Sequence, residues 1–98
     1  MNAGLRGLTE LDRVIHEPGR LLIVALLYAV AEADFLYLLN ETGLTKGNLS
    51  GHLSKLEEAG YVEITKTYRG KIPLTVCRLS ASGRSAFEKY RKALKATL

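Results

Sequence analysis

The spacing of apolar residues changes from a helical to a strand period along this 98-residue chain, and that change restricts its fold most strongly. Leu49, Leu53 and Leu56 recur at helical spacing and form one apolar stripe. From residue 61 onward the pattern alternates and is rich in β-branched residues, which is typical of strands. A helical pattern returns after Ser80. The chain is therefore expected to be mainly α with one β-hairpin, an α+β fold.

Residues that start and stop helices divide the first half of the pattern. Asp34 and Thr45 have the short polar side chains that cap helix N-termini, and Gly43 and Gly60 can adopt the positive φ that ends a helix. Pro18 suits a first helical turn, because its missing N–H would be unpaired there anyway. We therefore expect helices over residues 8–15, 20–31, 35–42, 45–59 and 82–96.

Two strands are expected, over residues 61–67 and 72–79, joined by a turn at residues 68–71 that contains Gly70. Pro73 cannot donate a backbone hydrogen bond, so strand 72–79 is expected either at a sheet edge or with Pro73 among its first residues. Ser80 or Ser82 is expected to cap the last helix.

Length and composition limit the protein class. A chain of 98 residues with 47% hydrophobic and 24% charged residues is expected to form one domain over residues 1–98. The longest apolar run, Leu21–Ala31, is too short to cross a membrane, which takes about 20 residues. The N-terminus lacks a secretory pattern, so a cytoplasmic location is expected. A lone Cys77 allows no internal disulfide and no cysteine-rich metal site; it is interpreted as a small hydrophobe, with oxidation sensing as the alternative.

Charge is unevenly distributed along the chain. Residues 1–45 carry three basic against six acidic side chains, whereas residues 46–98 carry eleven against four. A positive half of this kind indicates an anionic partner, nucleic acid first and a membrane surface second. A solubilising surface with a basic tail is the alternative interpretation.

Helices 35–42 and 45–59 are separated by a short turn and form a predicted helix-turn-helix, followed directly by the hairpin. The sequence from Gly43 to Val62, together with His16–Ile23, Gly70–Thr75 and Leu79–Arg84, resembles small single-domain winged-helix DNA-binding regulators related to the MarR and ArsR regulators of archaea and bacteria. The resemblance covers roughly residues 8–95. It implies a winged helix-turn-helix protein that binds duplex DNA as a homodimer, often as a repressor, with a recognition helix over 45–59 in the major groove.

The predicted recognition helix carries short polar and basic residues on the side away from its leucine stripe. An Asn amide can pair with adenine, serine hydroxyls can reach bases or phosphates, and lysines suit phosphates. Glycine inside a helix costs about 1 kcal/mol relative to alanine, yet it allows close approach to a groove. The residues expected to contact DNA are Thr45, Lys46, Gly47, Asn48, Ser50, Gly51, Ser54 and Lys55. The alternative is that they start the helix and pack loosely, and His52 is left between local packing and a phosphate contact.

The hairpin turn is the predicted wing. Tyr68, Arg69 and Lys71 surround Gly70 and are expected to contact the DNA backbone or minor groove. The alternative is a charged edge that prevents strand aggregation. The resemblance further implies dimerisation through terminal helices 8–15 and 82–96, with interface residues Leu8, Leu11, Ile15, Phe87, Tyr90 and Leu94.

No catalytic, metal-binding or cofactor-binding arrangement is evident in the sequence, so no enzymatic activity and no cofactor are expected. Two other functions remain open: a winged-helix module that contacts proteins, and a chromatin-like DNA binder indifferent to sequence. A small-molecule effector, if one exists, is expected in a crevice between the terminal helices and the DNA-binding lobe.

Overall fold

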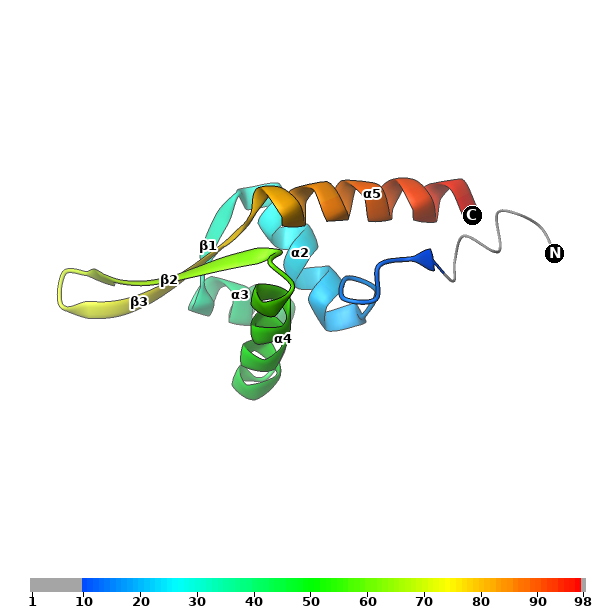
Figure 1. Cartoon of the computed structure of the whole chain (residues 1–98). Helices are drawn as coiled ribbons and strands as arrows, with labels where there is room; N and C mark the ends of the chain where they lie inside the picture. The colour runs from blue at the N-terminus through cyan, green and yellow to red at the C-terminus, as the bar shows by residue number, and fades with distance from the viewer. Residues whose placement is uncertain (1–9, 98) are drawn as a thin grey trace.

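The computed structural model describes residues 10–97 and contains helices packed with a small three-stranded antiparallel sheet (Figure 1). The fold is a winged helix, as expected. The helices within this range are α2 (Pro18–Val30), α3 (Phe35–Thr42), α4 (Lys46–Glu58) and α5 (Ala81–Thr97), and the strands are β1 (Glu32–Asp34), β2 (Val62–Arg69) and β3 (Ile72–Leu79). The β2–β3 hairpin projects from one side of the helices and α5 extends from the other (Figure 1).

The sheet has the strand order β1-β3-β2, so β3 is central and not an edge strand. The edge position considered for residues 72–79 is therefore wrong. The alternative holds, because Pro73 is the second residue of β3 and β1 pairs only with Val76–Arg78. Strand β1 was missed by the sequence analysis, because Glu-Ala-Asp is short and contains no β-branched residue.

The helix boundaries follow the predicted caps. Asp34 accepts a hydrogen bond from the Tyr37 N–H at 2.8 Å, and Thr45 Oγ1 accepts one from the Asn48 N–H at 3.1 Å. Ser80, one of two predicted caps for the last helix, accepts from the Gly83 N–H at 2.9 Å. Helix α3 ends at Gly43 in the left-handed region (φ 70°), and Gly60 (φ 78°) follows α4. These predictions are confirmed.

The expected helix over residues 8–15 does not form within the described part of that segment. Residues 8 and 9 lie outside the described range, Glu10 is in a 3₁₀ conformation, Leu11 is in a bend, and residues 13–15 form a turn. Asp12 Oδ1 accepts hydrogen bonds from the N–H groups of Val14 (2.9 Å) and Ile15 (3.2 Å). A carboxylate bonded to the backbone two and three residues later offers that backbone an alternative to helical hydrogen bonds.

One core lies between the helices and the inner face of the sheet. Leu27, Leu38 and Leu56 are fully buried there, and so is Cys77 of β3. Burial raises the pKa of the Cys77 thiol to about 11. The cysteine therefore packs as a small hydrophobe and stays protonated, which is the interpretation that the sequence favoured. Within residues 10–97, no helix is both long enough and apolar enough to cross a membrane.

Candidate nucleic-acid interface

Helix α4 divides into a buried face and an outward face. Leu49, Leu53 and Leu56 are buried in the core, as their spacing predicted. The residues predicted to contact DNA are all exposed: Thr45, Lys46, Gly47, Asn48, Ser50, Gly51, Ser54 and Lys55. Thr45 is already engaged as the N-cap of α4. The outward face is thus short-chained and polar, with a lysine near each end of the predicted set.

The two glycines of this face have open space around them. A Cβ atom added at Gly47 or at Gly51 would have no heavy atom within 4 Å. Both glycines lie inside a helix, where alanine is more stable by about 1 kcal/mol. Packing within the described chain therefore gives no reason for glycine at either position.

His52 turns away from this outward face and lies against the start of α2. Its Nε2 is 3.7 Å from Glu17 Oε1, and its Nδ1 is 3.3 Å from Arg20 Nη1. Two roles were considered for His52, local packing and a phosphate contact, and the contacts in the structure are those of local packing.

The hairpin presents a mixed basic and apolar tip. Gly70 takes the left-handed conformation at the turn (φ 65°), and Tyr68, Arg69 and Lys71 are exposed around it, with Tyr68 70% exposed. Ile72 pairs with Arg69 across the hairpin and is 65% exposed. Ile72 was not predicted to be part of the wing, although its large aliphatic side chain close to a predicted turn glycine could have indicated it.

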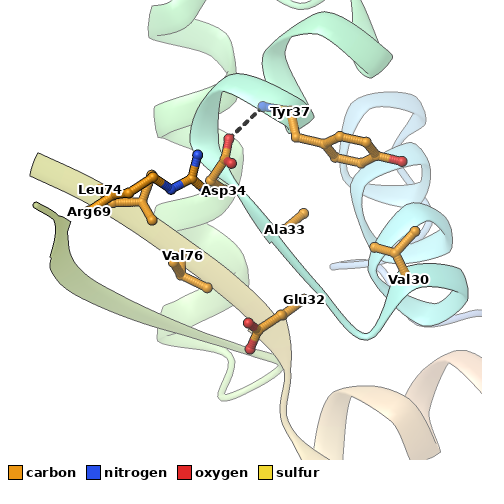
Figure 2. Close-up of a pocket in the computed structure, with 8 residues that line it drawn as sticks. All are labelled: Val30, Glu32, Ala33, Asp34, Tyr37, Arg69, Leu74 and Val76. Atoms are coloured by element: carbon orange, nitrogen blue, oxygen red, sulfur yellow. Dashed lines mark hydrogen bonds between the residues drawn. The ribbon is translucent and has the colours of Figure 1, made fainter. Parts of the chain in front are cut away.

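A shallow cavity of about 340 Å³ lies beside β1 at the base of the hairpin (Figure 2). It is lined by Val30, Glu32, Ala33, Asp34, Tyr37, Arg69, Leu74 and Val76. Figure 2 shows the Arg69 side chain extending from β2 toward Asp34, whose carboxylate already accepts from the Tyr37 N–H. Arg69 is therefore shared between the wing and an acidic cavity, whereas Lys71 lies at the turn itself.

The residues predicted for a dimer interface mostly contribute to the core of the chain itself. Leu11, Ile15, Phe87 and Tyr90 are buried within the chain, and Leu94 packs against the same core. Leu8 lies outside the described residues. An apolar helix stripe predicts burial but does not say whether a partner or the chain itself provides the contact.

Hydrogen bonds join the segment before α2 to α5 and to the start of β2. Tyr90 OH lies 2.8 Å from His16 Nδ1, and Tyr61 OH donates to Asp12 Oδ2 at 2.5 Å. That hydrogen bond to Asp12 and burial raise the pKa of Tyr61 to about 12. A hollow of about 850 Å³ lies beside these contacts, between residues 10–12, Tyr61 and α5.

Within residues 10–97, no group of three or more histidine, cysteine or acidic side chains is placed to hold a metal ion. The exposed face of α4 carries Lys46 and Lys55, and the hairpin turn carries Arg69 and Lys71.

Comparison with known proteins identifies the family. Residues 20–98 match the model of the winged helix DNA-binding domain. An uncharacterized protein of Methanocaldococcus jannaschii is 39% identical over 79 residues, which are 80% of this chain and 85% of that protein.

Solved structures give the same result. A transcriptional regulator homologue from Pyrococcus horikoshii OT3 superposes with a TM-score of 0.87 at 29% identity, covering 93% of this chain and 92% of that one. NadR in complex with 4-hydroxyphenylacetate shares the fold, with a TM-score of 0.69 at 22% identity over 93% of this chain and 67% of that chain. The chain belongs to the winged helix DNA-binding domain family.

Proposed function

We propose that this protein is a sequence-specific transcriptional regulator that binds duplex DNA as a homodimer and represses the genes whose operators it occupies. Helix α4 enters the major groove, and the β2–β3 hairpin contacts the backbone or the adjacent minor groove. The observation that carries the proposal is the outward face of α4, where Gly47 and Gly51 leave the helix backbone open among short polar side chains. Such a surface costs helix stability and suits close contact with base edges.

The outward side chains divide into base-reading and backbone-binding groups. Asn48 can form two hydrogen bonds with adenine, and Ser50 and Ser54 can bond to bases or phosphates. Lys46 and Lys55 suit phosphates, which fix the position of the protein on the duplex without reading its sequence. Thr45 keeps its capping role and so orients the first turn of the helix.

The wing adds a second contact. Lys71 and Gly70 form the turn, and Tyr68 offers a hydroxyl that is exposed to solvent. Arg69, which also lines the cavity beside Asp34, adds a second cation next to the turn. Cations at a hairpin tip suit the phosphates that border a minor groove.

A homodimer would place two copies of α4 in successive major grooves, roughly 34 Å apart, on a pseudo-palindromic operator. The proposal assigns dimerisation to the terminal segments, as the family resemblance implies. NadR was solved with a small molecule bound. By analogy, the hollow between residues 10–12, Tyr61 and α5 is the proposed place for an effector of this protein.

Selection from a randomised duplex pool at about 0.15 M salt tests the proposal, because that salt concentration suppresses nonspecific binding. The expected result is enrichment of one motif with two-fold symmetry. Asn48→Ala should relax the base preference, whereas Lys46→Ala should weaken all duplexes equally.

Other outcomes contradict the proposal in different ways. Retention without enrichment indicates a chromatin-like binder. No retention, with or without added small molecules, indicates a protein-interaction module. Equal effects of Asn48→Ala and Lys46→Ala on selected and random DNA contradict the division of contacts. A reporter gene behind the enriched operator tests repression, and increased transcription would contradict it.

A further inference from the structure

His52 connects the candidate recognition helix to the first turn of α2. The ring leaves α4 beside the leucine stripe and is partly buried. Its two nitrogens face opposite charges: Nδ1 is 3.3 Å from Arg20 Nη1, and Nε2 is 3.7 Å from Glu17 Oε1. A single side chain of α4 is therefore held between a cation and an anion that both belong to α2 or its cap.

The ring of His52 is held from two sides. A guanidinium group only donates hydrogen bonds, so Arg20 can act only as a donor toward Nδ1 of His52. The opposite ring nitrogen, Nε2, lies on the side of the Glu17 carboxylate. Glu17, Arg20 and His52 are together called the clamp.

The two partners of His52 are themselves fixed. Arg20 Nε donates to the Val14 carbonyl at 2.6 Å, and the Arg20 N–H donates to Glu17 Oε1 at 2.8 Å. That backbone hydrogen bond is the main reason why the pKa of Glu17 is lowered, with the charges of His52 and Arg20 adding to it against the effect of burial. The position of the ring is therefore set by groups that have little freedom of their own.

Gly19 lets α2 approach the ring closely. A Cβ at this position would lie 2.6 Å from His52 Nε2 and 2.7 Å from His52 Cδ2. Since real Cβ contacts do not come so close, any larger residue at position 19 would displace the ring. The start of α2 therefore lies so close to the His52 ring of α4 that only glycine fits at position 19 without moving the ring.

We propose that His52 is a positioning residue, which fixes the angle of α4 on α2 and thereby the pose of α4 on DNA. This inference rests on the proposed function. The charged groups that face the ring are Glu17 and Arg20 from α2, and Lys55 follows one turn later on α4 itself.

The experiment measures the affinity of the full chain for the enriched duplex. His52→Ala should weaken binding about tenfold, comparable to the loss of one base contact. His52→Asn should bind within about threefold of the unsubstituted protein, because its amide oxygen can accept from Arg20 and only a weak contact with Glu17 is lost.

Two outcomes of this experiment overturn the proposal. One is a His52→Ala variant that binds as tightly as the unsubstituted protein. The other is a His52→Asn variant that binds as weakly as the His52→Ala variant.

Thermal unfolding tests the clamp without DNA. Gly19→Ala should lower Tm in the unsubstituted protein, because the new methyl group meets the ring. The same change should raise Tm in a His52→Ala background, where alanine only improves helix propensity. Absence of this reversal overturns the proposal. If the protein binds no duplex at all, the proposed function is contradicted. The opposite signs of the Tm change in the two backgrounds then still test the clamp, because that measurement does not involve DNA.

Discussion

Glycine occurs inside helices on two sides of this molecule, and the space around it differs completely. At Gly83, where α5 begins against the start of β2, a Cβ would overlap the Tyr61 carbonyl oxygen. At Gly47 and Gly51 on α4, a Cβ would meet nothing within 4 Å. Position 83 needs glycine, because a side chain there would collide with the backbone of Tyr61. Gly47 and Gly51 lower the stability of α4, and no contact within the described chain compensates for that loss. Packing within the described part of the chain therefore explains the glycine at position 83 and does not explain the glycines at positions 47 and 51.

Gly83→Ala should have the largest effect. The new methyl group would meet backbone atoms of Tyr61, whose carbonyl also accepts from the Ser80 N–H at 3.0 Å. Overpacking against backbone that cannot move away should cost about 3 kcal/mol of unfolding free energy. Urea unfolding measures the loss, with Gly47→Ala as the matched control. Equal stabilities of the two variants would remove the contrast between the two sides.

Gly51→Ala should change stability and DNA binding in opposite directions. The domain should gain up to about 1 kcal/mol, because alanine is the better helix former. The methyl group should nevertheless reduce affinity for the enriched duplex about tenfold, since it stands between the helix backbone and the bases. Calorimetry and a binding titration on the same protein give both values. Stabilisation together with unchanged affinity would place the duplex elsewhere.

On the packed side of the molecule, the raised pKa of Tyr61 predicts that the free energy of unfolding decreases at alkaline pH. Its folded pKa of about 12 exceeds the ordinary value near 10, so the neutral phenol is favoured by the fold. This contribution is complete below pH 10 and is lost progressively as pH rises toward 12. Denaturation series at successive pH values should show the decline, and both Tyr61→Phe and Asp12→Asn should flatten it. A decline that is as steep in both variants would assign it to other groups.

Lys71→Ala should have the smallest effect, on the exposed side. Removing one phosphate contact should weaken all duplexes a few-fold and reduce the slope of log affinity against log salt by about one. Lys92→Ala on α5 removes the same charge at a site away from the wing and should leave the slope unchanged. Identical slopes for both variants would exclude Lys71 from the interface.

The sequence allowed the order of the elements to be predicted wherever local chemistry decides. Asp34, Thr45 and Gly43 act within one helical turn, so their roles could be inferred without knowing the rest of the fold. Strand β1 could not be inferred, because its pairing with β3 joins segments more than 40 residues apart. The turn at residues 13–15 was missed because Leu11 and Ile15 have helical spacing while Asp12 binds the backbone between them.

The candidate site was predictable in composition but not in orientation. The leucine stripe of α4 fixed which residues face outward, so the exposure of Asn48 and Gly51 followed. Nothing local indicated that His52 would meet Glu17 and Arg20, since those residues lie more than 30 positions earlier. For Phe87 and Tyr90, the amphipathic pattern could not distinguish a partner subunit from the core of the chain itself.

Chemical modification of the buried Cys77 thiol can report how often the core of this domain opens. The thiol is buried at the central strand, and its pKa of about 11 keeps it unreactive while the core is closed. Since Cys77 is the chain's sole cysteine, any modification by a thiol reagent counts exposures of this one position. When opening and closing are faster than labelling, the labelling rate divided by that of a fully exposed thiol gives the equilibrium constant of the fluctuation that uncovers Cys77, and hence its free energy. The protein carries this reporter natively, so every variant above can be compared without attaching a probe.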